Sequence, residues 1–266
     1  MQPALGTDRV NILGIGVSAI TMRDATATLE CWIRDRTPGY VCITGVHGVM
    51  ESRRDTALQT IHNAAGMVTP DGMPLVWMAR LLGFPHVERV YGPDLMREMS
   101  AISAARGYRN FYFGGATGVA EQLRDSMCRA CPGLQVVGTA CPPFHPPTEE
   151  EDAAAVRAIN AARPDIVWVG LSTPKQERWM AAHRGRLDAP VLVGVGAAFD
   201  FLSGRKRQAP RWMQRNGLEW AFRMATEPRR LAGRYLRNNP AFLVSALRQL
   251  AQPSAYPHGR GGAATP

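Results

Sequence analysis

The 266-residue sequence predicts an α/β protein: an open, mostly parallel, Rossmann-like sheet with helices on both faces, followed by a basic helical appendage. Short β-rich runs alternate with longer segments of helical period. The runs I-V-W-V-G-L at 166–171 and V-L-V-G-V-G at 191–196 have no polar face, so helices should cover both sides of these strands. After Gly204 the strand pattern stops and only helical segments follow.

The alternation gives the elements in order. The expected strands are residues 11–17, 40–44, 66–69, 110–114, 134–139, 165–171 and 191–195. The expected helices between them are residues 21–35, 48–64, 74–82, 94–106, 118–131, 149–162 and 175–186. The appendage should hold helices at 210–226, 228–237 and 240–250, each with Pro near its start. We therefore expect a catalytic domain at 1–204, an appendage at 205–250 and, from its Pro, Gly, Ser and Ala content, a disordered tail at 251–266.

The net charge of +9 is concentrated in the last quarter of the chain. Residues 201–266 hold twelve Lys or Arg and two acidic residues, whereas the first 200 residues hold nineteen basic and twenty acidic ones. A segment with this charge is suited to binding phosphate groups of a nucleic acid, of an anionic membrane or of a ligand diphosphate. The alternative is that the charges only keep a helix face solvated.

The cysteines and the hydropathy pattern indicate a compartment. Five scattered cysteines favour a reducing one, and the pair Cys128 and Cys131 has no second pair at zinc spacing. The sequence shows no signal peptide, and no apolar run reaches the ~18 residues that span a bilayer. We expect a cytoplasmic protein that binds the inner face of the cell membrane peripherally.

Two strand ends carry candidate catalytic residues, because ligands of parallel sheets bind beyond the carboxyl ends of the strands. In T-G-V-H-G (44–48), Thr44 could orient a hydroxyl group and His47 could contact substrate. The alternatives are that Thr44 caps a helix and that His47 is structural. In T-P-D-G-M-P (69–74), Asp71 is the candidate general base for an acceptor hydroxyl, with a helix cap again as the alternative.

Two later strand ends offer candidate binding residues. In L-S-T-P-K-Q-E-R-W (171–179), backbone N–H groups and Lys175 at a helix start suit an anion, and the Gln176 amide suits a sugar or base. A capping box would explain the same residues, and the two roles are compatible. The glycine-rich run at 193–204 brings in Asp200, followed by a basic triplet.

No D-x-D pair occurs among the eleven Asp residues, so we expect no metal and no cofactor. Arg and Lys would then neutralise a departing diphosphate. The appendage supplies the candidates: Arg211, Arg215, Arg223, Arg229, Arg230, Arg234 and Arg237.

Several long blocks together resemble the WecG/TagA/CpsF family of bacterial glycosyltransferases. They are T-P-D-G-M-P-L-V-W, E-R-V-Y-G-P-D-L-M, F-Y-F-G-G-A-T-G-V-A-E, P-D-I-V-W-V-G-L-S-T-P-K-Q-E, and G-V-G-A-A-F-D-F-L-S-G with R-Q-A-P-R-W-M-Q-R-N-G-L-E-W. The resemblance covers residues 11 to about 239. It implies a metal-independent, inverting hexosyltransferase that moves a sugar from a UDP-sugar to a polyprenyl-diphosphate-linked sugar in exopolysaccharide or other surface-polymer synthesis.

The resemblance also implies site residues. It places the base on Asp71 and the strand-end Thr on Thr44, and it adds Arg89 from E-R-V-Y-G and Gln176 from P-K-Q-E. Many members have Asn two residues after the Thr, where this chain has Val46. T-G-V-H-G is closer to members that make exopolysaccharide, such as the xanthan glucosyltransferase, which leaves UDP-glucose and UDP-N-acetylmannosamine open as donors.

The expected partners follow from the charge and the resemblance. They are a UDP-sugar, a lipid-linked acceptor and an anionic membrane surface, with Arg223 and Arg230 among the donor-binding residues. The side chains expected in the bilayer are Trp212, Leu218, Trp220, Phe222 and Leu231. A homo-oligomer is compatible with the sequence, which does not fix the oligomeric state.

Two rival functions are open to test. The G-I-G-V-S-A run at 14–19 resembles a dinucleotide fingerprint, which would suit an NAD-dependent oxidoreductase with a Rossmann fold, but no acidic residue ends a second strand ~20 residues later. A nucleic-acid-binding module would explain the basic tail but not the strand-end blocks at Asp71 and Gln176, so we expect no nucleic acid.

Overall fold

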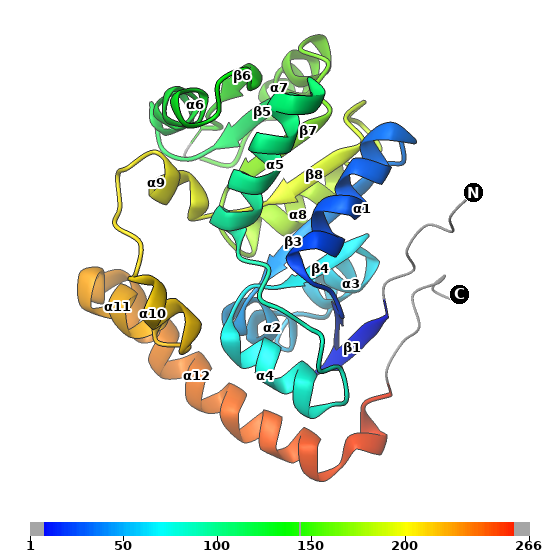
Figure 1. The fold of residues 1–266 in the computed structure, drawn as a ribbon, viewed down its shortest axis with the longest axis vertical. Coiled ribbons are helices and arrows are strands. Elements are labelled where there is room, and N and C mark those ends of the chain that lie inside the picture. Colours follow the sequence, from blue (N-terminus) through cyan, green and yellow to red (C-terminus); the bar gives the residue numbers. More distant parts are fainter. Residues whose placement is uncertain (1–7, 144, 258–266) are drawn as a thin grey trace. The chain divides into compact units, whose positions relative to one another are not determined.

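The computed structural model describes residues 8–143 and 145–257 and contains a six-stranded sheet in the order β4-β3-β8-β7-β5-β6 (Figure 1). The strands are β3 (Gly39–Thr44), β4 (Met67–Pro70), β5 (Arg109–Gly114), β6 (Gln135–Ala140), β7 (Ile166–Gly170) and β8 (Val191–Gly194). The pairs β3–β8, β8–β7, β7–β5 and β5–β6 are all parallel. The predicted α/β fold with a mostly parallel sheet is confirmed.

Residue contacts divide the chain into two compact units. Unit 1 comprises residues 1–24, 43–91 and 208–266, and unit 2 comprises residues 25–42 and 92–207. The division falls inside β3, whose last two residues belong to unit 1. The sequence-based division at residues 204 and 250 stays a prediction.

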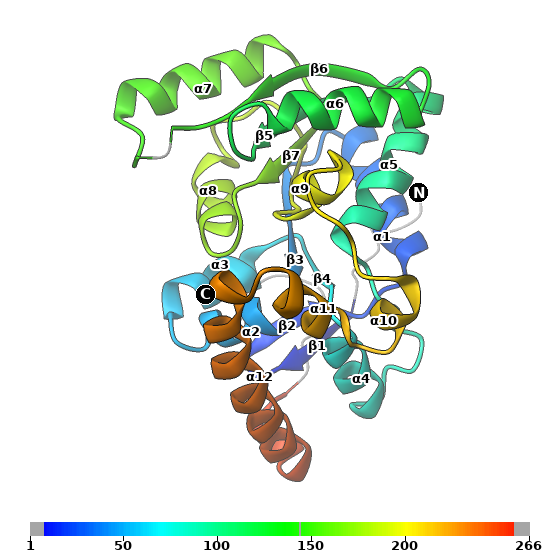
Figure 2. The same ribbon diagram turned by 90° about the vertical axis from the view of Figure 1, so that its left-hand side faces the viewer.

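Unit 2 holds most of the parallel sheet and the helices that cover it. These helices are most of α1 (Met22–Arg34), then α5 (Gly92–Arg106), α6 (Val119–Ala130), α7 (Glu149–Ala161), α8 (Lys175–His183) and the short α9 (Ala198–Leu202). Helix α8 packs against β7 and β8, while α6 packs against β5 and β6. Figure 2 shows α5 and α8 on opposite sides of β7. The buried, uniformly apolar strands therefore have helices on both faces, as their sequence predicts.

Unit 1 combines β4, the end of β3 and the C-terminal helices. Its helices are α2 (Val46–Ser52), α3 (Thr56–Ala64), α4 (Met73–Leu81), α10 (Arg211–Arg215), α11 (Glu219–Thr226) and α12 (Pro228–Ala251), followed by the 3-10 helix η1 (Pro253–Ala255). Helix α12 packs against α2 and against α11. Of the tail predicted to be disordered, residues 258–266 lie outside the described residues.

The first predicted strand, residues 11–17, is wrong. The segment forms an antiparallel hairpin of β1 (Arg9–Ile12) and β2 (Ile15–Ser18). The turn between them is Leu13–Gly14, with φ angles of 55° and 93°. Two consecutive positive φ angles are typical of a two-residue hairpin turn, in which Gly carries no steric cost.

Four predicted helices have wrong boundaries: two of them divide, and two others are joined. The predicted helix at 48–64 divides because Asp55 accepts a hydrogen bond from the Leu58 amide and so starts α3. The predicted helix at 210–226 divides at Gly217, whose φ is +70°. Conversely, α12 continues through Pro240 as one helix. Pro240 removes the hydrogen-bond donor for the Leu236 carbonyl, but Leu236 is 69% exposed, so water can replace that donor.

Candidate active site

In unit 1, Asp71 follows directly on β4 and begins the turn into α4. Its amide donates to the Thr44 carbonyl at 3.0 Å, which ties Asp71 to the end of β3. Gly72 caps α4, and a Pro occupies the first turn of that helix, so the local sequence ends the strand here. A Cβ on Gly45 would lie 3.7 Å from Oδ2 of Asp71, so the carboxylate lies over glycine backbone. The Asp71 side chain is 31% exposed, which leaves it accessible for chemistry.

Arg89 lies between two carboxylates in the same unit. Its Nε donates to the Asp71 carbonyl, and its Nη2 lies 3.9 Å from Oδ1 of Asp71 and 2.5 Å from Oε2 of Glu219. The guanidinium also lies 4.0 Å over the Tyr91 ring, a cation–π contact. Burial lowers the pKa of Arg89, but Asp71 and Glu219 outweigh burial and raise the pKa overall, so the side chain stays charged.

Tyr91 and Gln208 complete the surroundings of Glu219. The Tyr91 hydroxyl donates to Oε1 of Glu219 at 3.0 Å, and Gln208 Nε2 donates to the Tyr91 hydroxyl at 3.4 Å. Burial, together with Glu219, raises the pKa of Tyr91 far above its ordinary value, so the hydroxyl remains protonated and can donate. This network joins the segment after α4 to α11.

Thr44 and His47 flank the start of α2. Thr44 is only 1% exposed, and its Oγ1 lies 3.1 Å from Nε2 of the buried His62. His47 Nδ1 lies 3.1 Å from Asn238 Nδ2 on α12 and 3.7 Å from Glu51. Because the Asn238 amide nitrogen can only donate, Nδ1 of His47 accepts this hydrogen bond. His47 thus links α2 to the C-terminal helix.

Three arginines of the C-terminal helices form a cluster in unit 1. Arg223 lies on α11, and Arg230 and Arg234 lie one turn apart on α12. Burial lowers the pKa of Arg234, and the like charges of Arg230 and Arg223 lower it further. Arg230 also pairs with Glu227 through its Nε at 2.7 Å. Guanidinium groups that repel one another in a half-buried place are suited to an anion that would offset their charge.

In unit 2, Gln176 is held at the start of α8. It is 2% exposed, and its Nε2 donates to the Gly194 carbonyl and to Oε1 of Glu177, both at 3.1 Å. Its Oε1 has no hydrogen-bond partner among the described residues. Lys175, the first residue of α8, is exposed. The side-chain oxygen of Gln176 is therefore a buried acceptor beside Gly196. A Cβ added to Gly196 would lie 3.2 Å from this oxygen.

Asp200 lies on α9, in the glycine-rich segment of unit 2. Its Oδ2 lies 2.8 Å from Nζ of Lys206, and its carbonyl accepts from the Lys206 amide at 3.0 Å. Lys206, the middle residue of the basic triplet, therefore folds back on Asp200. Asp200 was predicted to bind substrate, and this ion pair gives it a local partner.

Sequence reasoning missed His62, Tyr91, Glu219 and the pairing role of Asn238. His62 and Asn238 are polar residues on mostly apolar buried helix faces, a weak signal that becomes a contact only when the helices pack. Tyr91 and Glu219 lie inside the quoted family blocks, so the resemblance could have pointed to them. The hydrogen bonds from Tyr91 and Arg89 to Glu219 could not be seen in the sequence, because they join residues 128 and 130 positions apart.

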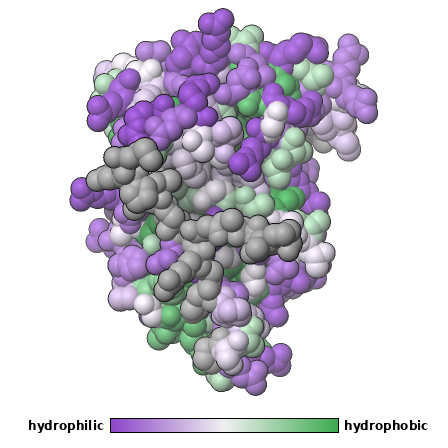
Figure 3. All heavy atoms as spheres, turned by 90° about the vertical axis from the view of Figure 1, so that its right-hand side faces the viewer, coloured by the Kyte–Doolittle hydropathy of each residue, from purple (hydrophilic) through white to green (hydrophobic). Residues whose placement is uncertain are grey.

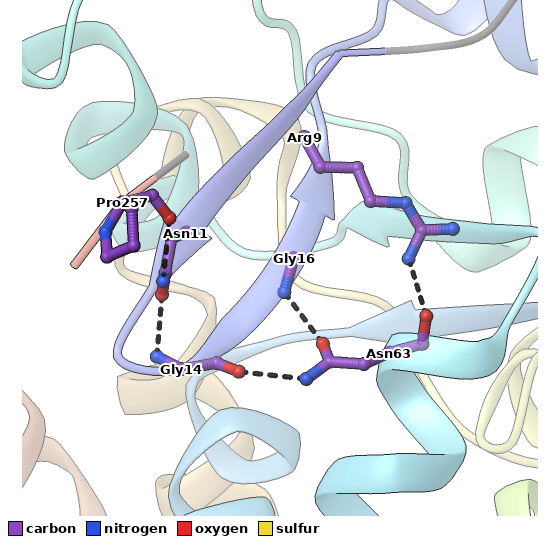
Figure 4. A pocket seen from close by; sticks show the side chains of 6 residues that line it. All are labelled: Arg9, Asn11, Gly14, Gly16, Asn63 and Pro257. Atoms are coloured by element: carbon purple, nitrogen blue, oxygen red, sulfur yellow. Dashed lines mark hydrogen bonds between the residues drawn. The ribbon is translucent and has the colours of Figure 1, made fainter. Parts of the chain in front are cut away.

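The Gly14 motif does not form a dinucleotide site. A dinucleotide fingerprint requires a strand that turns into a helix, whereas Gly14 lies in the β1–β2 hairpin turn. A shallow pocket of about 220 Å³ lies there, lined by Arg9, Asn11, Gly14, Gly16, Asn63 and Pro257 (Figure 4). Asn63 accepts from the Gly16 amide at 2.9 Å and donates to the Gly14 carbonyl at 3.0 Å (Figure 4). Asn63 and Asn11 thus accept from the Gly16 and Gly14 amides, the N–H groups that a diphosphate would need.

The exposed large hydrophobic side chains among the described residues all lie in unit 1. They are Trp77, Leu81, Trp212, Leu218, Trp220, Leu236, Leu243, Val244 and Leu247. Figure 3 shows hydrophobic patches among the polar side chains on the face it draws. Of the residues predicted to enter a bilayer, Leu231 is fully buried and that prediction is wrong, because Leu231 lies on the inner face of α12.

Helix α12 has a buried inner face and an exposed, apolar outer face. The inner face holds Leu231, Phe242 and Ala246 together with the polar Asn238 and Gln249, all buried. The outer face holds Leu236, Leu243 and Leu247, spaced seven and four residues apart and each at least 59% exposed. None of the helices in residues 8–143 and 145–257 is long and apolar enough to cross a membrane. Within the same ranges, no three His, Cys, Asp or Glu side chains gather as metal ligands would.

Comparison with known proteins adds the family. The family model described as "Glycosyl transferase WecG/TagA/CpsF family" matches residues 10–256. An N-acetylglucosaminyldiphosphoundecaprenol N-acetyl-beta-D-mannosaminyltransferase of Bacillus spizizenii is 28% identical over 234 residues, 88% of each chain. A transferase of the same name from Staphylococcus aureus is 25% identical over 239 residues, 89% of this chain and 91% of its own. The chain belongs to the WecG/TagA/CpsF glycosyltransferase family, and it is a glycosyltransferase.

Proposed function

We propose that this enzyme transfers a sugar from a UDP-sugar to a sugar linked to a polyprenyl diphosphate, with inversion at the anomeric carbon. The observation that carries the proposal is the arrangement in unit 1: the Asp71 carboxylate at the end of β4, with Arg89 3.9 Å from it and a cluster of three arginines on α11 and α12. A carboxylate can take a proton, and guanidinium groups can receive a leaving diphosphate.

The reaction is a single displacement. Asp71 takes the proton of the acceptor hydroxyl, and the oxygen attacks the anomeric carbon of the donor. The bond from that carbon to the phosphate oxygen breaks, and its electron pair leaves with UDP. Because one attack occurs on the face opposite the leaving group, the anomeric configuration inverts.

We assign the leaving group to the arginine cluster. Arg223, Arg230 and Arg234 would offset the charge that develops on the diphosphate, and Arg89 would hold Asp71 in place. Arg234 was only one of seven candidates in the sequence, and its half-buried position between like charges favours it.

The remaining predicted residues keep the substrate-binding role that the sequence predicts. In unit 2, Gln176 has a buried acceptor that would receive an N–H or hydroxyl group, and Lys175 adds positive charge at the start of α8. His47 and Asp200 would contribute less directly, since both already have protein partners.

We propose UDP-N-acetylmannosamine as the first donor to test, with N-acetylglucosaminyl-diphospho-undecaprenol as the acceptor, because these suit the transferases named above. UDP-glucose is the second candidate. It is favoured by one observation in this chain, the Val46-His47 pair in T-G-V-H-G, where many relatives have Asn after the glycine.

We propose that the outer face of α12 binds the membrane that holds the acceptor lipid. Leu236, Leu243 and Leu247 would enter the interface, and the basic residues of the same helix would attract anionic headgroups. Trp212 and Trp220, both exposed, would lie at headgroup level.

The test is a donor screen with the purified full-length enzyme and a short-chain polyprenyl-diphosphate N-acetylglucosamine. UDP-N-acetylmannosamine, UDP-glucose and UDP-N-acetylglucosamine are compared by product mass and by UDP release. Product from one of the first two donors, with the anomeric configuration inverted as read from the one-bond C1–H1 coupling in NMR, supports the proposal. UDP release without transfer, or product from none of the donors at enzyme-excess concentrations, contradicts it.

A further inference from the structure

A chain of buried hydrogen bonds leads from α3 to the backbone of Asp71. His62 on α3 is fully buried, and its Nε2 lies 3.1 Å from Oγ1 of Thr44. The Thr44 carbonyl in turn accepts from the Asp71 amide at 3.0 Å. His62 is therefore linked to Asp71 through a single residue.

The neighbours of His62 fix its tautomer. Nδ1 lies 3.2 Å from the Leu58 carbonyl and 3.1 Å from Oγ of Ser52. Ser52 donates its one hydroxyl proton to the Gly48 carbonyl at 2.9 Å, so the Ser52 oxygen can only accept a hydrogen bond from Nδ1. Both neighbours of Nδ1 are acceptors, and Nδ1 must carry the hydrogen. Burial lowers the pKa of His62, which keeps the ring neutral and Nε2 unprotonated.

This tautomer decides how Thr44 can act. An unprotonated Nε2 can only accept, so the Thr44 hydroxyl donates to it. The same hydroxyl proton cannot then be donated to a substrate oxygen. With the side chain only 1% exposed, the link from Thr44 towards the reactive carboxylate is its carbonyl, which holds the Asp71 amide.

Gly48 is the residue that allows this packing. A Cβ at position 48 would lie 3.0 Å from Cγ2 of Thr44 and 3.7 Å from Nε2 of His62. The first distance is closer than side chains normally approach, so a larger residue would press against Thr44 beside its hydrogen bond to His62. A glycine at this point of α2 costs helix stability, and the close approach of Thr44 and His62 gives a reason for it.

We propose that His62 is a positioning residue that acts through Thr44 on Asp71, and that Thr44 places the base rather than contacting the sugar. The proposal rests on the proposed function in one respect, the role of Asp71 as the base. It differs from the sequence prediction for Thr44, in which the hydroxyl orients a substrate hydroxyl.

The kinetic test uses variants that keep or remove single hydrogen bonds. His62→Asn keeps a donor near the Nδ1 position and removes the acceptor for Thr44, whereas His62→Gln can place an amide oxygen at the Nε2 position. Thr44→Val removes the hydroxyl, and Thr44→Ser keeps it. We expect His62→Asn and Thr44→Val to lower kcat about 10-fold or more with KM for the donor nearly unchanged, because a misplaced base slows the chemical step. His62→Gln and Thr44→Ser should recover most of kcat.

The double variants separate positioning from substrate contact. If both residues act through Asp71, His62→Asn combined with Thr44→Val costs no more than either alone. In an Asp71→Asn background, each change should lose its effect on kcat. A rise in donor KM on Thr44→Val, or an undiminished loss of kcat in the Asp71→Asn background, overturns the proposal. His86→Asn, at an exposed histidine of unit 1, is the matched control and should leave kcat unchanged.

A spectroscopic measurement tests the link without relying on activity. Two-bond proton–nitrogen correlation in protein labelled with ¹⁵N-histidine distinguishes a hydrogen on Nδ1 from one on Nε2. We expect His62 as the Nδ1-protonated, neutral ring at pH 7.5, and a hydrogen on Nε2 overturns the proposal. If Asp71→Asn alone retains full turnover, the proposed base is wrong while the tautomer result still stands, so the two failures are distinguishable.

Discussion

Nη2 of Arg89 donates to Oε2 of Glu219 across 2.5 Å, which joins the segment after α4 to α11 within unit 1. The side chains are 15% and 14% exposed, so water screens the pair only weakly. Through this ion pair the helices that carry the arginine cluster are tied to the residue that also contacts Asp71. The pair therefore links the proposed base to the proposed leaving-group site.

Removing Glu219 should loosen α11. Glu219→Ala leaves the largely buried Arg89 without its nearest counter-charge, and losing one partner of such a pair costs on the order of 3 kcal/mol. We expect a lower melting temperature and faster proteolysis at α11, with a smaller effect for Glu219→Gln. The matched control is Glu227→Ala, which breaks the exposed pair with Arg230 and should cost less than about 1 kcal/mol. Equal melting temperatures for the two variants would contradict this role.

Asp71→Asn should lower turnover by about 100-fold or more, because an amide cannot take the acceptor proton. Binding of UDP, the nucleotide part of the donor, should stay nearly intact as measured by titration calorimetry. Asp94→Asn serves as the control, since Asp94 pairs with Arg97 at the surface and has no proposed role. Near-normal turnover of Asp71→Asn would remove Asp71 from the role of base.

Arg234→Met should weaken binding of UDP. The side chain keeps its bulk but loses the charge that the neighbouring Arg223 and Arg230 repel. We expect about a 10-fold higher Kd for UDP, in the range of a charge-assisted hydrogen bond, and an unchanged or higher melting temperature without ligand. Arg248→Met on the same helix is the control. A lower melting temperature with unchanged Kd would show that Arg234 is structural.

Glu177→Gln should stabilise unit 2 at neutral pH. Glu177 is 1% exposed, and burial raises the pKa of its carboxyl above the ordinary 4.5. Above pH 4.5 the unfolded chain therefore loses its proton first, and the free energy of unfolding falls until the pH passes the folded pKa. Glutamine does not titrate, so the variant does not lose stability in this way. Its melting temperature should exceed that of the unaltered protein at pH 7.5 and be nearly equal to it at pH 4. Glu150→Gln, exposed on α7, is the control, and a gain of equal size at both pH values would argue against this explanation.

Leu243→Ser combined with Leu247→Ser should abolish binding to anionic vesicles in a flotation assay. Both residues lie on the outer face of α12, where the change removes apolar area without opening the core. Higher salt should weaken binding of the unaltered protein. Leu81→Ser, at an equally exposed leucine of α4, is the control. If Leu81→Ser abolishes flotation and the α12 variant does not, a different surface binds the lipid.

The sequence alone predicted the type and order of most elements, for a physical reason. Buried parallel strands such as β7 and β8 must be apolar on both faces, and the apolar residues of a helix must recur every 3.6 residues. Both requirements produce patterns that are visible in a short stretch of sequence. The strand ends that hold Asp71 and Gln176 follow from the same pattern. The resemblance to family blocks added Arg89, which no local rule singles out.

The tertiary structure decided the pairings and the breaks. The Leu13–Gly14 turn and the unbroken α12 depend on how neighbouring segments satisfy backbone groups, which a run of residues does not reveal. The contacts His62–Thr44 and Arg89–Glu219 join residues 18 and 130 positions apart, and each side chain alone has an ordinary identity. Hydrogen bonds of this kind depend on distances between elements, and only the folded chain sets those distances.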